Sequence, residues 1–122
     1  MSNEDKDAFQ QQITFTVDPG NLGQTTSFAV TPHARLVIEQ IGASIDLPPG
    51  QKLNYYVVST TVGGVLANYF FDGANNLKST CTQRVRIYAD PNTQVVLAAN
   101  RDNDQDVAVV RMAVSGYLVA LP

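Results

Sequence analysis

Apolar and polar residues alternate with a period of two along much of this chain, and no segment of helical length shows a convincing 3.6-residue pattern. The clearest alternation spans residues 9–17. One side of this segment carries Phe9, Gln11, Ile13, Phe15 and Val17, and the other carries only Gln and Thr. This pattern is typical of a strand with one buried face, so the sequence predicts an all-β fold.

We expect about eight strands, separated by clusters of Gly, Pro, Asn and Asp. Their expected ranges are 9–17, 25–30, 35–45, 52–61, 65–71, 80–89, 94–99 and 107–121. Turns at intervals of roughly 10 to 15 residues favour an antiparallel β-sandwich, jelly-roll-like, with a closed small barrel as the alternative. Gly116, inside the last strand, indicates a bulge or a close backbone approach.

A short proline pattern precedes three of the expected strands. Pro32, Pro49 and Pro91 are each followed, four residues later, by the first apolar residue of a strand. Proline fixes φ and cannot donate to a β-ladder, so it marks the entry to a strand.

The length of 122 residues and the apolar fraction of 44% fit one domain with one core. We expect a flexible tail over residues 1–7 and a single sandwich domain over residues 8–122. Only 16% of the residues are charged and the net charge is −3, which argues against a general nucleic-acid-binding protein. The sequence contains no apolar run of about 18 residues, so we expect no insertion into a membrane. The acidic N-terminus lacks a signal-peptide pattern, so we expect a cytoplasmic, non-classically exported or already processed chain.

The acidic segment 100–106 is the sharpest local cluster. Asp102, Asp104 and Asp106 alternate, and their hard oxygen atoms suit Ca²⁺ if the backbone curls. The Gly and the distal Glu of an EF-hand are missing, so that motif is excluded. The alternative is a solvated hairpin loop in which Arg101 screens the charge. Together with Val107–Val110, the segment resembles the calcium loop of fucose-binding bacterial lectins, and this resemblance implies calcium-dependent sugar binding.

A second resemblance covers more of the chain. The segments Pro32–Glu39, Leu47–Gln51 and Val114–Val119 are similar to short bacterial β-sandwich proteins of unassigned function. It implies the same architecture and transfers no catalytic residue.

A candidate ligand or partner surface combines cationic and aromatic side chains. Arg84 and Arg86 share one strand face with Tyr88, and could bind an anion or a sugar. Tyr55 and Tyr56 are adjacent in a strand, so they point to opposite faces and cannot both be in one core. The alternative for the arginines is an exposed strand face that charge protects against edge pairing.

Catalytic machinery is not evident. His33 is the only histidine and follows a proline in a turn. Cys81 is the only cysteine and sits among Thr80, Thr82 and Gln83, with no cation adjacent to it. One histidine and one cysteine cannot form a typical zinc site. Most of the carboxylates fall in turns, with Glu39 expected inside a strand. We therefore expect a protein that is not an enzyme.

Adjacent apolar pairs recur inside the strands, and each pair places one residue on each side of its sheet. They are Val37–Ile38, Val57–Val58, Val95–Val96 and Val109–Val110. Because an isolated two-sheet sandwich buries one face per strand, the second face needs a cover. We therefore expect a homo-oligomer or a repeating assembly, to which the strand 9–17 could contribute by adding to a neighbour. The alternative is a lectin-like module that binds a glycan, with or without Ca²⁺.

Overall fold

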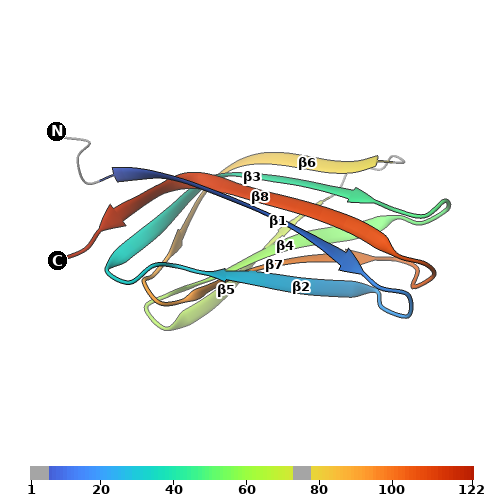
Figure 1. Cartoon of the computed structure of the whole chain (residues 1–122), viewed down its shortest axis with the longest axis horizontal. Helices are drawn as coiled ribbons and strands as arrows, with labels where there is room; N and C mark the ends of the chain where they lie inside the picture. Colours follow the sequence, from blue (N-terminus) through green and yellow to red (C-terminus); the bar gives the residue numbers. More distant parts are fainter. Residues whose placement is uncertain (1–5, 73–77) are drawn as a thin grey trace.

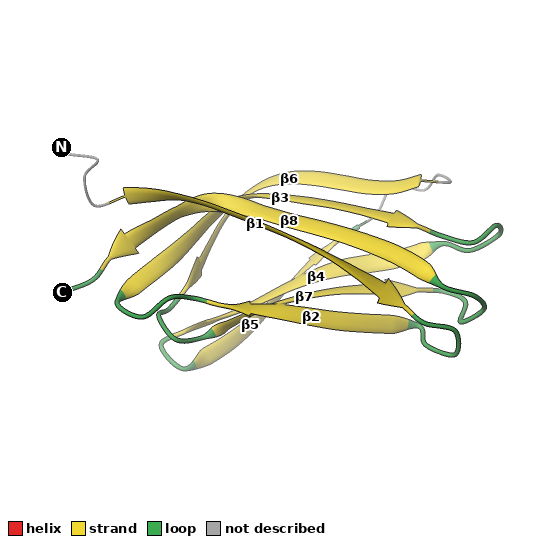
Figure 2. Ribbon diagram, in the orientation of Figure 1, coloured by secondary structure: helices red, strands yellow, loops and turns green. Residues whose placement is uncertain are grey.

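The computed structural model describes residues 6–72 and 78–122, which form eight strands, and no helix occurs among them (Figure 2). The strands are β1 (Lys6–Val17), β2 (Gly23–Ala29), β3 (Ala34–Asp46), β4 (Leu53–Val62), β5 (Val65–Phe71), β6 (Lys78–Ala89), β7 (Gln94–Arg101) and β8 (Ala108–Ala120). The main differences from the expected ranges lie at two ends. Lys6 and Asp7 belong to β1, opposite Val119 and Leu118, and β7 continues to Arg101. The rest of the predicted tail, residues 1–5, lies outside the described part.

The strands form two four-stranded antiparallel sheets (Figure 1). The first sheet has the order β1-β8-β3-β6 and the second has the order β2-β7-β4-β5. Among the described strands, β4 and β5 are the consecutive pair that stays within one sheet, and each other connection passes from one sheet to the other. This order is that of a jelly roll, so the predicted sandwich is confirmed and the barrel alternative is not.

The core lies between the two sheets, because each strand turns one side of its alternating pattern inward. In β1 the inward residues run from Phe9 to Val17, as predicted, and Phe9 stacks on Phe28 of β2 with ring centroids 5.7 Å apart. Leu36, Ile38 and Leu97 are fully buried. Burying one such side chain contributes about 1.5–3 kcal/mol relative to leaving it in water.

The register of the first sheet is interrupted at Glu39. Ile38 lies opposite Gly116 and Gln40 lies opposite Ser115, so Glu39 is an extra residue on β3. A Cβ atom at Gly116 would overlap the backbone carbonyl oxygen of Val37. The close backbone approach predicted at Gly116 is therefore confirmed, and the bulge lies opposite it, on β3.

Four proline turns share one backbone conformation. The residue after each proline has a positive φ: Gly20 (90°), His33 (66°), Gly50 (84°) and Asn92 (61°). Proline followed by a residue with positive φ is typical of a type II turn. Three of these prolines, Pro32, Pro49 and Pro91, are those of the repeated pattern, and each leads into a strand as predicted.

Different side-chain contacts connect the loops at the two ends of the sandwich. At the end that holds the termini, the Asp90 carboxylate accepts hydrogen bonds from the Gly63 backbone N–H (2.7 Å) and from Arg35 Nε (3.0 Å). These contacts, that of Gly63 above all, lower the pKa of Asp90, against an opposing effect of burial. At the opposite end lie the β1–β2, β3–β4 and β7–β8 loops (Figure 1).

Residues 6–72 and 78–122 include no helix that is long and apolar enough to span a membrane.

Candidate functional site

Arg101 organises the end of the sandwich that carries the acidic segment. It is the last residue of β7 and, although charged, its exposed fraction is 0%. Its guanidinium donates to the carbonyl oxygens of Asp18 (3.1 Å) and Asp106 (2.7 Å). Its other contacts are the carbonyl oxygens of Asn21 (3.2 Å) and Gln105 (3.3 Å) and the Gln51 side-chain oxygen (3.1 Å).

These contacts join three loops that are far apart in the sequence. A planar guanidinium with five N–H donors suits such a junction, because no other side chain can satisfy so many carbonyl groups at once. The sequence interpretation, in which Arg101 screens the acidic side chains, is wrong, since Arg101 binds carbonyl groups and an amide. Val95, Leu97 and Ala99 alternate on the inward side of their strand. Extending this alternation by two residues would have predicted that Arg101 is buried.

The three acidic side chains have separate neighbours. The Asp102 carboxylate accepts from the Lys52 backbone N–H at 2.8 Å, and the Asp104 carboxylate accepts from the Gln105 side chain at 3.2 Å. Asp106 has a φ of 63° and directs its carbonyl oxygen to Arg101. Within the described ranges, no three His, Cys, Asp or Glu side chains are grouped so as to hold a metal ion. Calcium binding by Asp102, Asp104 and Asp106 stays a prediction.

The predicted ligand or partner surface is divided among three places. Tyr56 is fully buried in the core, so its assignment to a surface is wrong. Burial above all raises its pKa, with smaller effects of Cys81 and Asp46. Tyr55 lies on the outer face of the second sheet, where its ring meets Phe70 edge-on with centroids 5.3 Å apart. Arg84, Arg86 and Tyr88 lie on the outer face of the first sheet, on edge strand β6.

Charged residues are segregated between the two sheets. The four strands of the second sheet contain one charged residue, Arg101, and it is buried. The strands of the first sheet contain Lys6, Asp7, Arg35, Glu39, Asp46, Lys78, Arg84, Arg86 and Arg111. On this sheet Arg111 of β8 pairs with Asp46 of β3 at 3.2 Å. The strands without exposed charge are therefore the four strands of the second sheet.

The outer face of the second sheet, which we call the neutral face, is apolar at its centre. A shallow hollow of about 410 Å³ there is lined by side chains that include Tyr55, Val57, Phe70, Val96 and Ala98. The hairpin of β4 and β5 beside this hollow is rich in exposed apolar residues, of which Leu66 and Phe70 lie on the neutral face. Five of the eight large apolar side chains that are exposed in the described residues lie in the β4–β5 hairpin: Val62, Val65, Leu66, Tyr69 and Phe70.

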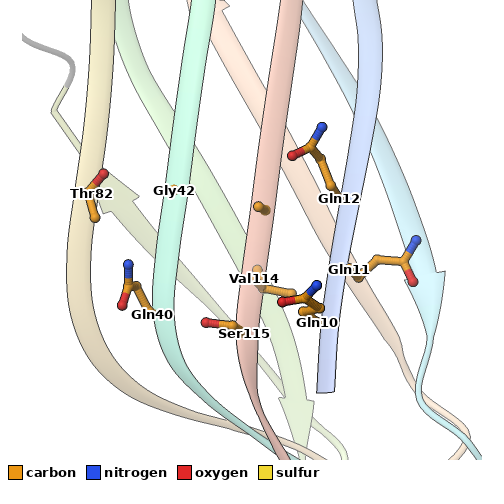
Figure 3. Close-up of a pocket in the computed structure, with 9 residues that line it drawn as sticks. Gln10, Gln11, Gln12, Gln40, Gly42, Thr82, Val114 and Ser115 are labelled. Carbon is orange, nitrogen blue, oxygen red and sulfur yellow. The ribbon is translucent and has the colours of Figure 1, made fainter. Parts of the chain in front are cut away.

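The outer face of the first sheet carries a polar hollow of about 350 Å³, which we call the glutamine hollow. Figure 3 shows Gln10, Gln12, Gln40, Thr82 and Ser115 placed around Gly42, with Gln11 pointing away. A Cβ atom at Gly42 would meet no atom within 4 Å, so the floor of the hollow is open. Gln40 and Ser115 also line an adjoining hollow with Glu39, Arg84 and Arg86.

The only cysteine lies inside a strand and the only histidine lies in a turn. Cys81 is buried on β6, and burial, with a smaller effect of Asp72, raises the pKa of its thiol, which therefore stays protonated near neutral pH. His33 is exposed in a turn, where its carbonyl oxygen accepts a hydrogen bond from the Leu121 backbone N–H at 2.8 Å.

The architecture, the neutral face and the glutamine hollow are the features by which this protein can be compared with others. Both resemblances noted in the sequence stay predictions. Comparison with known proteins finds no family model, no curated protein and no solved structure that matches this chain.

Proposed function

We propose that this protein is a non-catalytic structural subunit that self-associates through the neutral face of its second sheet. The observation that carries the proposal is the segregation of charge: one sheet holds nearly all the charged strand residues, and the other exposes none. Depletion of charge and enrichment of aromatic residues distinguish the centre of a protein interface from an ordinary surface. Tyr55 and Phe70 supply the aromatic part.

The adjacent apolar pairs support the same surface. On the first sheet, outward Val37 lies between Tyr88 and Tyr117 on the neighbouring strands and is 3% exposed, so this chain covers it by itself. On the second sheet, the outward residues Val57 and Val96 line the open hollow of the neutral face. A second copy is the simplest cover for an apolar sheet face that this chain leaves open.

The first experiment measures the mass of the protein in solution. We expect a dimer or a larger assembly at micromolar concentration by light scattering after gel filtration. Val96→Lys should weaken the association at least tenfold, equivalent to about 1.4 kcal/mol, because an ammonium group in the apolar hollow loses its hydration.

The matched control is Val109→Lys, which places lysine on the outer face of the first sheet, also on an inner strand of its sheet. This variant should associate like the wild-type protein. A wild-type mass that stays monomeric throughout the concentration range would refute the proposed function.

The second candidate function is carbohydrate binding, and the glutamine hollow favours it. Planar amide and hydroxyl groups are suited to sugar hydroxyls, because each can both donate and accept a hydrogen bond. In the described part of the chain, the side chains of Gln10, Gln12, Gln40, Thr82 and Ser115 make no hydrogen bond to protein. Neighbouring Arg84 and Arg86 would favour a sugar that carries a carboxylate.

A glycan array tests this candidate, with the protein applied in calcium and again in a chelator. We expect binding that Gly42→Leu abolishes, since leucine would fill the hollow, while Gly42→Ala retains it. Loss of binding in the chelator would additionally support calcium at Asp102, Asp104 and Asp106. An array without signal in both conditions would dispose of this candidate.

A further inference from the structure

We propose that two copies of this chain pair through the free edges of their β5 strands, antiparallel and about a two-fold axis at Asn68. This inference rests on the proposed self-association and adds a second contact to it, through the free edge of the sheet whose outer face is the neutral face. It joins the second sheets of two copies side by side into one continuous sheet.

The edge of β5 lacks the features that keep strand edges apart. Its residues, Val65–Phe71, include no charged residue, no proline and no glycine. Such an edge is a template for another strand, which proteins normally prevent with charge, proline or a bulge. The edge strands of the first sheet carry charges, among them Lys6 on β1 and Arg86 on β6. The remaining edge strand, β2, lies beside β1 through the Phe9–Phe28 contact (Figure 1).

The turn before β5 determines which backbone groups face the free edge. Gly63 and Gly64 form a two-residue turn with φ values of 59° and 78°, and Val62 lies opposite Val65. A two-residue turn of this kind closes on a hydrogen-bonded pair, and such pairs then alternate along the hairpin. Val65 and every second residue after it therefore bond to β4. The N–H and C=O groups that point to the free edge belong to Leu66, Asn68 and Phe70.

The sequence of β5 is complementary to itself about Asn68. In the proposed pairing, Asn68 lies opposite Asn68 of the second copy, and Leu66 lies opposite Phe70 of the second copy. These are the residues whose backbone N–H and C=O groups point to the free edge. They can therefore form the hydrogen-bonded pairs that a two-fold axis at Asn68 requires. Leu66 is 59% exposed and Phe70 is 64% exposed, and each would gain the other as a neighbour.

The inward side of the pairing is complementary in size. Ala67 would lie opposite Tyr69 of the second copy, and Val65 would lie opposite Phe71, so each small residue faces a large one. A two-fold pairing also uses both β5 edges, which closes the assembly at this contact. Pairing of β5 with a different edge strand of the second copy would leave that copy's β5 edge free to recruit more copies.

Disulfide cross-linking tests the axis directly, in the full chain with Cys81→Ala to remove the native thiol. Asn68→Cys places two cysteines directly opposite, with Cα atoms about 5.5 Å apart, within the reach of a disulfide. Val65→Cys is the control. In the same pairing, the two copies of residue 65 are separated by about 20 Å along the strands.

We expect an oxidant at micromolar protein concentration to convert Asn68→Cys into a covalent dimer and to leave Val65→Cys monomeric. Val65 is 67% exposed, so random collisions would cross-link the control at least as readily. Equal cross-linking of the two variants would overturn the inference. If neither variant cross-links while the wild-type protein has the mass of a dimer, the β5 axis is wrong and self-association stands. A monomeric wild-type protein would refute both the β5 pairing and the proposed self-association.

Leu66→Pro gives a second, independent measurement. Proline removes the N–H group of residue 66, which faces the free edge and makes no hydrogen bond to β4. The β-sheet signal in circular dichroism should therefore not change. We expect dimerisation to weaken at least tenfold, whereas Leu66→Ser, which keeps the N–H, should weaken it less. Unchanged dimerisation of Leu66→Pro would contradict the pairing.

Discussion

Replacing Arg101 with methionine is expected to lower the free energy of unfolding by about 3–5 kcal/mol. The side chain is fully buried, and its guanidinium satisfies carbonyl groups from the β1–β2 and β7–β8 loops together with the Gln51 amide. Methionine fills a similar length but donates nothing, so several polar groups lose their partner. Urea unfolding followed by circular dichroism measures the change.

Two control variants separate geometry from charge. Arg101→Lys keeps the charge but not the planar fork, so it should recover only part of the lost stability. Arg111→Met removes an exposed arginine whose partner, Asp46, is 61% exposed, and should change stability by about 1 kcal/mol or less. If Arg101→Met were no more destabilising than Arg111→Met, Arg101 would not hold the loops together.

Replacing Gly116 with alanine is expected to destabilise the protein by about 2–4 kcal/mol. The added Cβ would overlap the Val37 carbonyl oxygen and lie 3.1 Å from the Glu39 backbone nitrogen. These atoms are backbone atoms of the bulge in β3, so they can move only if the β3–β8 pairing shifts. Thermal unfolding measures the loss as a lower Tm.

Gly42→Ala is the matched control, because Gly42 lies in the same sheet and the added Cβ would meet no atom within 4 Å. Alanine in a strand restricts the unfolded chain more than glycine does, so Gly42→Ala should be neutral or stabilising by about 0.5–1 kcal/mol. A similar loss of stability in both variants would mean that Gly116 has no special role at the bulge.

Part of the candidate surfaces follows from alternation within single strands. Because neighbouring strand residues face opposite ways, the sequence required that Tyr55 and Tyr56 separate, and likewise Phe70 and Phe71. The structure places Tyr56 and Phe71 against the core and Tyr55 and Phe70 on the neutral face. Alternation could not say which member of each pair was buried, since that depends on which side of the strand meets the other sheet.

The glutamine hollow is different, because no stretch of sequence contains it. Gln10 and Gln12 come from β1, Gln40 from β3, Thr82 from β6 and Ser115 from β8. These strands become neighbours only in the order β1-β8-β3-β6, which pairs segments about a hundred residues apart, such as Gln12 with Ala113.

The sequence by itself determined the strands, the alternation of their two sides and the proline turns, because backbone conformation and side-chain alternation depend on residues next to each other. The tertiary structure alone decided which strands share a sheet. That decision gathers strands 23–29, 53–62, 65–71 and 94–101, which expose no charged residue, into one sheet, and it buries Arg101 where three loops meet. The physical reason is that sheet membership is set by long-range pairing and packing, to which local preferences contribute little.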